Sequence, residues 1–169
     1  MSQKIALIFG GTRGIGAACV QKLAHDGFDV AYTYVKSAPN VPEKIGQAKT
    51  KGYAVDVRDA AQVEKVFADV AHDFGSMPHC VVANAGINVP PGPIATYDDK
   101  HFRDVVEVNL IGAFHVLRAA AKHVVDGGTI IGLSTSMVRV GIPGGGAYTS
   151  SKAAVESLLR SMAKELALR

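Results

Sequence analysis

The chain has 169 residues and a mass of 17.7 kDa, which is enough for one domain with its own core and leaves little room for two. Its 48% hydrophobic and 20% charged residues argue against a disordered or fibrous chain, and its formal charge of +3 is too small to indicate a nucleic-acid surface. No apolar run reaches the ~18 residues of a membrane span. We expect one cytoplasmic domain over residues 1–169 that binds neither nucleic acid nor membrane. Cys19 and Cys80 lie far apart without metal-ligand spacing, so we expect buried, reduced thiols and no metal site.

Strand-like and helix-like segments alternate along the chain. In chain order they are a strand at 5–9, a helix at 13–25, a strand at 29–35, a short helix near 43–49, a strand at 53–57, a helix at 59–74, a strand at 80–83, a helix at 98–125, a strand at 129–133 and a helix at 148–168. This alternation predicts an α/β fold, a doubly wound parallel sheet with helices on both faces.

Apolar stripes predict which helix faces are buried. In the helix at 13–25 the stripe runs through Ile15, Ala18, Cys19 and Leu23. The helix at 59–74 begins at a capping residue, Asp59, and its inward positions are Val63, Val66, Phe67 and Val70. The long helix has its stripe at Phe102, Val105, Val106, Leu110, Phe114 and Leu117.

A glycine-rich turn joins the first strand to the first helix. Gly10, Gly14 and Gly16 follow the pattern G-x-x-x-G-x-G. Glycines at this place let the backbone turn sharply and approach a pyrophosphate, which the amides and dipole of the helix N-terminus favour. The turn therefore predicts a dinucleotide site, the alternative being a glycine-rich turn without a ligand.

The charges near this turn favour NADP(H) over NAD(H). An NAD site usually has an acidic residue at the end of the second strand, but the strand here ends without one. Arg13 lies in the turn and Lys36 follows the strand. Two cations without a carboxylate suit a 2′-phosphate, although both could also be solvated surface charges.

A tyrosine and a lysine lie one helical turn apart near the start of the last helix. Tyr148 and Lys152 therefore share one face. A phenol is almost entirely neutral at pH 7, but a nearby ammonium favours the phenolate, so the pair could exchange a proton with a carbonyl oxygen. Taken alone, the pair is more typical of an amphipathic surface helix than of a catalytic site.

Five motifs in this order resemble the short-chain dehydrogenase/reductase family, in particular the 3-oxoacyl-carrier-protein and trihydroxynaphthalene-type reductases. They are the glycine turn at 10–16, Asn84-Ala85-Gly86, Asn109-Leu110-Ile111-Gly112, Ser134-Thr135-Ser136 and Tyr148-Thr149-Ser150-Ser151-Lys152. The resemblance covers the whole chain. It implies a Rossmann-like sheet of strand order 3-2-1-4-5 and an NADP(H)-dependent oxidoreductase that interconverts a carbonyl and a secondary alcohol. The alternative is a non-catalytic nucleotide-binding or scaffold module on the same fold.

The resemblance also implies roles for individual residues. Tyr148 would be the general acid or base, Lys152 would favour its phenolate form and hold the nicotinamide ribose, and Asn109 would anchor a water that passes protons to solvent. A loop hydroxyl would bind the substrate oxygen; Ser134 is favoured, then Ser136, and Thr135 is chemically able. The implied cofactor-binding residues, with Asp56 near the adenine, are Gly10, Thr12, Arg13, Gly14, Ile15, Gly16, Lys36, Asp56, Val57, Asn84, Ala85, Gly86, Tyr148 and Lys152.

Family members continue past the last helix into a sixth strand, a substrate lid and a seventh strand. We therefore expect a fold truncated before strands 6 and 7, with residues 129–133 as an exposed edge, and a chain that is part of a longer enzyme. The alternative is a short relative whose site a partner subunit closes. The implied partners are a small carbonyl or alcohol substrate and further copies of the chain, in a homodimer or homotetramer formed through the helices at 98–125 and 148–168.

Overall fold

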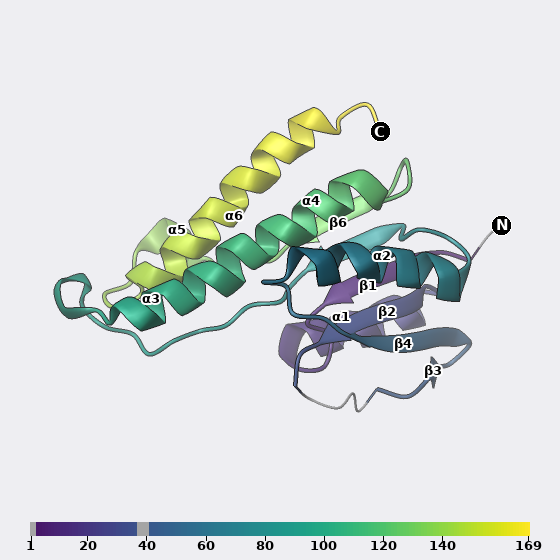
Figure 1. Cartoon of the computed structure of the whole chain (residues 1–169), viewed down its shortest axis with the longest axis horizontal. Helices are drawn as coiled ribbons and strands as arrows, with labels where there is room; N and C mark the ends of the chain where they lie inside the picture. Colours follow the sequence, from purple (N-terminus) through teal and green to yellow (C-terminus); the bar gives the residue numbers. More distant parts are fainter. Residues whose placement is uncertain (1–2, 37–40) are drawn as a thin grey trace.

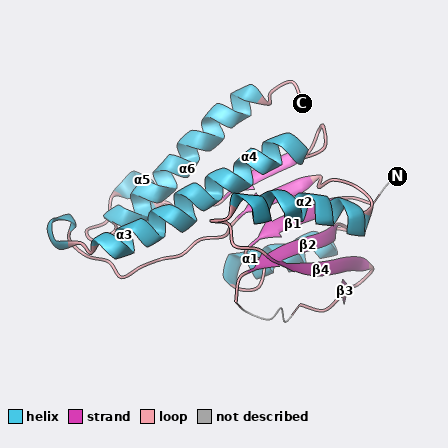
Figure 2. Cartoon of the chain, in the orientation of Figure 1, coloured by secondary structure: helices cyan, strands magenta, loops and turns pink. Residues whose placement is uncertain are grey.

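A mostly parallel sheet forms the centre of the computed structural model, which describes residues 3–36 and 41–169 (Figures 1 and 2). Its strands are β1 (Ile5–Phe9), β2 (Asp29–Tyr34), β3 (Lys44–Ile45), β4 (Ala48–Ala54), β5 (Cys80–Ala83) and β6 (Thr129–Gly132). They lie in the order β3-β4-β2-β1-β5-β6, and only β3 pairs antiparallel, with β4. The predicted order 3-2-1-4-5 is thus confirmed, with the short β3 added at one edge.

Helices cover both faces of the sheet. They are α1 (Gly14–His25), α2 (Ala60–Phe74), α3 (Asp99–Val105), α4 (Ala113–His123), α5 (Met137–Val140) and α6 (Gly146–Glu165), with a 3-10 turn η1 (Ile94–Thr96) and a π-helical segment η2 (Val106–Gly112). The predicted helix at 98–125 is the continuous rod α3-η2-α4, and α6 lies beside it (Figure 1). No helix of the described residues is long and apolar enough to cross a membrane.

Strand β1 contributes to two hydrophobic cores because its successive side chains point to opposite faces. Leu7 and its neighbours in register pack against α2 and α4, whereas Ile8 packs against α1 on the other face. Every residue of β1 is buried, as its continuous apolar run predicts. The turn that follows β1 is consequently attached to the most enclosed strand of the sheet.

The predicted short helix at 43–49 is wrong, because the chain forms a β-hairpin there. Gly46 has a positive φ of +60° and lies in the tight turn between β3 and β4. The predicted strand at 53–57 is shifted: it starts earlier, at Ala48, and ends at Ala54, so Asp56 lies in the loop after it. Ala48 and Thr50 are buried, while the lysines between and after them are exposed. This alternation of buried and exposed residues is the period of a strand and not of a helix.

The buried face of α1 also differs from the prediction. Ile15 is 62% exposed and Ala18 is exposed too, whereas Gly16, Val20 and Ala24 are buried. The expectation of buried thiols holds for Cys80 but not for Cys19, which is only partly buried. Gly16 packs against the Gly10 carbonyl in the turn that follows β1, and the next residue toward the N-terminus, Ile15, faces outward. In α2, by contrast, the four predicted inward residues are buried, and Asp59 accepts hydrogen bonds from two amides of the first turn.

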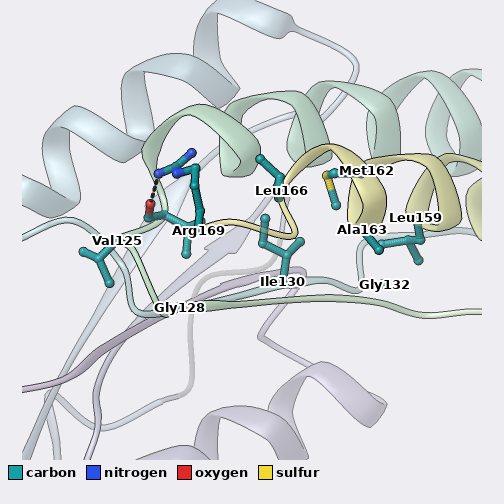
Figure 3. A pocket seen from close by; sticks show the side chains of 10 residues that line it. Val125, Gly128, Ile130, Gly132, Leu159, Met162, Ala163, Leu166 and Arg169 are labelled. Carbon is teal, nitrogen blue, oxygen red and sulfur yellow. Dashed lines mark hydrogen bonds between the residues drawn. The ribbon is translucent and has the colours of Figure 1, made fainter.

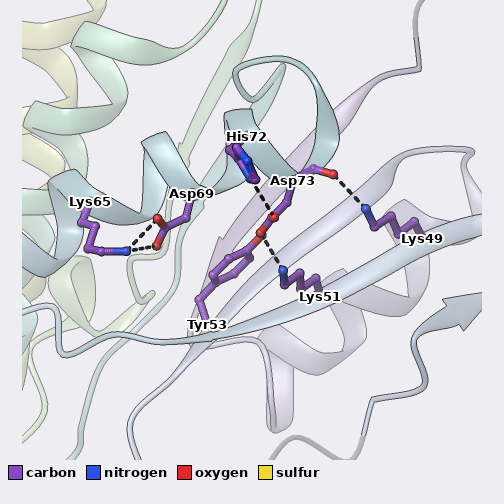
Figure 4. A network of polar contacts seen from close by, with 7 residues as sticks. All are labelled: Lys49, Lys51, Tyr53, Lys65, Asp69, His72 and Asp73. Atoms are coloured by element: carbon purple, nitrogen blue, oxygen red, sulfur yellow. Dashed lines mark hydrogen bonds and ion pairs between the residues drawn. The ribbon is translucent and has the colours of Figure 1, made fainter.

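A polar network ties strand β4 to the C-terminal end of α2 (Figure 4). Asp73 Oδ2 accepts hydrogen bonds from Lys51 Nζ and from the Tyr53 hydroxyl, each at 2.7 Å, and Lys49 Nζ donates to the Asp73 carbonyl at 2.8 Å. Hydrogen bonds from Lys51 and Tyr53 hold the pKa of the Asp73 carboxyl well below its usual range.

Strand β6 is the outer strand on the other side of the sheet. A largely apolar groove of about 460 Å³ runs between β6 and α6, and Ile130, Leu159 and Met162 lie along it (Figure 3). At one end Arg169 donates to the Ala121 and Val124 carbonyls of α4 at 2.7 and 2.9 Å. Its guanidinium thereby satisfies carbonyls that the last turn of a helix leaves without partners.

Candidate active site

A cleft of about 1100 Å³ lies over the carboxyl ends of the parallel strands. This edge is where doubly wound sheets bind ligands. The predicted site residues that line it are Gly10, Thr12, Arg13, Gly14, Ile15, Lys36, Asp56, Val57, Asn84, Ala85, Gly86, Ser134, Tyr148 and Lys152. Two others, Gly16 and Asn109, are buried and do not line it. The fold therefore brings segments from the whole length of the chain to one cleft.

The glycine turn is a tightly packed bend against the end of β5. Gly10 and Gly14 have positive φ angles of +78° and +54°. A Cβ on Gly16 would lie 1.9 Å from the Gly10 carbonyl oxygen. Asn84 Nδ2 donates to the Gly10 and Phe9 carbonyls at 2.9 and 3.2 Å, so the side chain of the Asn-Ala-Gly motif fixes the turn from the neighbouring strand.

The N-terminus of α1 faces this cleft without a side-chain cap. Its N-cap residue, Arg13, makes no capping hydrogen bond, whereas Asp59 and Asp98 cap α2 and α3. Uncapped first-turn amides and the positive end of the helix dipole favour an anion. With the glycine turn in front of them, they fit the pyrophosphate of a dinucleotide cofactor.

Four cations and two carboxylates also line the cleft. Arg13 and Lys36 are exposed and make no ion pair within the described residues. Arg58 forms a bidentate pair with Asp56, which lowers the pKa of the Asp56 carboxyl.

A second ion pair, Lys100 with Asp104, also borders the cleft. Neither Arg58 nor the Lys100–Asp104 pair was predicted. Arg58 follows Asp56 so closely in sequence that the pair could have been recognised. Lys100 and Asp104 are one helical turn apart in α3, but only the placement of α3 in the fold brings them to the cleft.

Tyr148 and Lys152 lie near the start of α6. Lys152 Nζ is 5.9 Å from the centroid of the Tyr148 ring. The lysine is only 5% exposed, and its ammonium donates to the Leu133 carbonyl at 2.9 Å. Burial lowers the pKa of the Lys152 ammonium, because the charged form loses solvation. A cation is thus held close to a phenol at the edge of the cleft.

Asn109 lies in the π-helical segment and is fully buried. Its amide forms a reciprocal pair with the Ile87 backbone, accepting from the amide at 2.8 Å and donating to the carbonyl at 2.9 Å. It also donates to Ser151 Oγ at 3.3 Å. A Cβ on Gly86 would lie 3.2 Å from Asn109 Oδ1 and 3.6 Å from Lys152 Nζ. The Asn-Ala-Gly loop therefore packs against both Asn109 and Lys152 at Gly86. π-helical turns occur frequently at functional sites.

The three candidate hydroxyls after β6 have different surroundings. Ser134 lines the cleft and donates to Glu156 Oε1 at 2.5 Å. The Thr135 hydroxyl accepts the Met137 amide at 3.3 Å. Ser136 is exposed at the start of α5. The contact with Glu156 was not predicted, since nothing in the sequence spacing shows that this loop meets the third turn of α6.

Comparisons with known proteins agree with this architecture. The family model described as short chain dehydrogenase matches residues 4–169. A short-chain type dehydrogenase/reductase from Picea abies is 36% identical over 96% of this chain, and the chain spans 65% of that protein. A 3-oxoacyl-[acyl-carrier-protein] reductase from Staphylococcus aureus is 34% identical over 98% of the chain, which spans 70% of it. Among solved structures, a short chain dehydrogenase from Burkholderia cenocepacia in complex with NADP superposes with a TM-score of 0.88 at 32% identity, over 99% of this chain and 71% of that one. The chain therefore belongs to the short-chain dehydrogenase/reductase family.

Proposed function

We propose that the protein is an NADP(H)-dependent oxidoreductase that interconverts a carbonyl and a secondary alcohol. One observation carries the proposal: a buried lysine beside a tyrosine and an uncapped, glycine-lined helix N-terminus border the same cleft. The first pair suits proton transfer at a carbonyl oxygen, and the second suits a dinucleotide. Membership of the family and the NADP complex of a structural relative support this reading.

Each residue of the Tyr-Lys-Asn group has a separate role in this proposal. The bound nicotinamide supplies or accepts the hydride. Tyr148 gives its hydroxyl proton to the carbonyl oxygen during reduction and takes it back during oxidation. Lys152 stabilises the phenolate that remains, since an ammonium close to the ring favours negative charge on it. Asn109 holds the Gly86–Ile87 backbone beside Lys152 and anchors the water through which the proton returns to solvent.

The preference for NADP(H) rests on two exposed cations. Arg13 and Lys36 border the cleft without ion-pair partners in the described ranges, and the nearby Asp56 carboxylate is held by Arg58. A 2′-phosphate placed there meets positive charge, and the negative charge of the Asp56 carboxylate, which would repel it, is offset by Arg58.

We further propose that the protein is a homodimer or homotetramer formed through α3-η2-α4 and α6. Phe102 and Phe114 on this rod are 45% and 40% exposed, although both belong to the predicted apolar stripe. Large apolar side chains on two helices that lie together are typical of an interface. Sedimentation of the wild-type protein and a Phe114→Glu variant measures this: the variant should shift to a smaller species.

A binding titration and one substitution test the catalytic proposal. We expect nicotinamide fluorescence to show tight binding of NADPH and weak binding of NADH. Tyr148→Phe should bind NADPH like the wild type and lose at least ~100-fold in turnover of ethyl 3-oxobutanoate, a soluble 3-oxoacyl ester, because the proton donor is absent. If NADPH binds but the wild type reduces no ketone of a broad panel, the non-catalytic nucleotide-binding or scaffold module is the better description.

A further inference from the structure

The end of β6 is attached to α6 through three consecutive residues. A Cβ on Gly132 would lie 2.6 Å from Leu159 Cδ1, so strand and helix are in close contact there. The Leu133 carbonyl accepts from Lys152, and the Ser134 hydroxyl donates to Glu156 at 2.5 Å. The three α6 residues recur at helical spacing and therefore lie on one face of the helix.

The hydroxyl of Ser134 has only one proton, and Glu156 accepts it. An ionised carboxylate accepts hydrogen bonds but cannot donate them, and such charge-assisted bonds are stronger than neutral ones. Ser134 could donate to a substrate oxygen only after leaving Glu156. The Thr135 hydroxyl accepts the Met137 amide at 3.3 Å, and Thr135 does not line the cleft.

We propose that Glu156 is a positioning residue that holds the loop after β6 through Ser134, and with it the Leu133 carbonyl that accepts the Lys152 ammonium. The part of the inference that concerns turnover rests on the proposed function. Glu156 itself does not line the cleft, and its outer oxygen is 3.5 Å from Arg160 Nη1 on the side away from Lys152 along the helix.

The position of the Ser134–Glu156 hydrogen bond, here called the clamp, explains why it would affect the reaction rate. Ser134 follows Leu133 directly, so fixing the serine side chain to α6 also fixes the carbonyl on which the Lys152 ammonium rests. The clamp also restrains Thr135, the residue that follows Ser134. Displacement of reacting groups by about 1 Å can cost ~100-fold in rate, so releasing this loop should lower kcat more than it changes KM.

Kinetics of four variants with NADPH and ethyl 3-oxobutanoate test the clamp. Glu156→Ala and Ser134→Ala should each lower kcat about tenfold with little change in KM, and the double variant should lose no more than either single one, because both remove the same contact. Glu156→Gln should restore most of the rate, since its amide oxygen still accepts the hydroxyl. Glu165→Ala, an exposed change on the same helix, is the control.

A second readout does not depend on turnover. Amide hydrogen exchange over residues 133–138 should accelerate in Glu156→Ala and Ser134→Ala, remain at the wild-type rate in Glu156→Gln, and leave α1 unaffected. A loss of ~100-fold in Ser134→Ala together with near-normal kcat in Glu156→Ala would overturn the inference and make Ser134 act on the substrate directly. If the wild type reduces no ketone, the proposed function fails, and unchanged exchange in Glu156→Ala would independently refute the clamp.

Discussion

Replacing Gly16 by alanine should damage both the fold and the cofactor site. The new Cβ would lie 1.9 Å from the Gly10 carbonyl oxygen and 2.5 Å from Asn84 Nδ2. A carbon–oxygen contact needs roughly 3.3 Å, so backbone or helix has to move by more than ~1 Å. Overpacking of this kind costs about 1–3 kcal/mol, and the hydrogen bond from Asn84 to Gly10 adds about 1 kcal/mol when it is lost. We therefore expect the free energy of unfolding to fall by about 2–4 kcal/mol.

The same movement should weaken NADPH binding. Displacing the amides of the turn by ~1 Å stretches hydrogen bonds of ~2.9 Å beyond their useful range, and losing one or two bonds to a charged group of ~1.5–3 kcal/mol each raises Kd at least tenfold. Urea denaturation and NADPH fluorescence titration measure the two effects. Gly14→Ala is the matched control: its φ is +54° but nothing lies within 4 Å of its Cβ, so only about 1–2 kcal/mol of backbone strain is expected. Equal stability and equal NADPH affinity of the two variants would refute the packing argument.

Two further predictions concern charge. Arg13→Ala and Lys36→Ala should each raise the Kd for NADPH about tenfold and leave that for NADH unchanged, because only NADPH carries the 2′-phosphate; equal effects on both cofactors in the titration would contradict the selectivity argument. Asp73 should make the free energy of unfolding depend on pH. Because the folded-state pKa of its carboxyl is depressed, the contribution of Asp73 to stability is complete above the unfolded pKa of ~3.9 and is lost as the pH falls below that value. Thermal unfolding between pH 6 and 2 should show a smaller acid loss in Asp73→Asn than in the wild type, whereas Asp69→Asn, which removes an exposed helical pair with Lys65, should behave like the wild type.

The sequence predicted those parts of the molecule that depend on local pattern. The apolar run at 5–9 and the capped stripe after Asp59 have the periods of the elements they form, and parallel strands then brought the motifs to one cleft. The predictions were wrong where contacts between elements determine the local structure. Gly16, and not Ile15, packs against the turn after β1, so Ile15 faces outward, and a turn at Gly46 replaced a helix by a hairpin.

The partner of Ser134 could not be foreseen for the same reason. Glu156 looks like an ordinary surface residue on an amphipathic helix until α6 is placed beside the end of β6. Composition and spacing describe one element at a time. Which of the three neighbouring hydroxyls already donates a hydrogen bond depends on how β6 and α6 pack against each other.

The π-helical segment also changes how the long helix can tolerate insertions and deletions. Each residue of an α-helix advances the chain by about 100° around the axis, so one residue more or less rotates everything beyond it by that angle. η2 accommodates one residue more per turn than an α-helix does, and α3 and α4 are both fitted to that offset. Deleting a single residue from 106–112 would produce a more regular and locally more favourable helix. It would also swing Val105 out of the core and remove Asn109 from Ile87, so the irregular form is the one that the rest of the molecule selects.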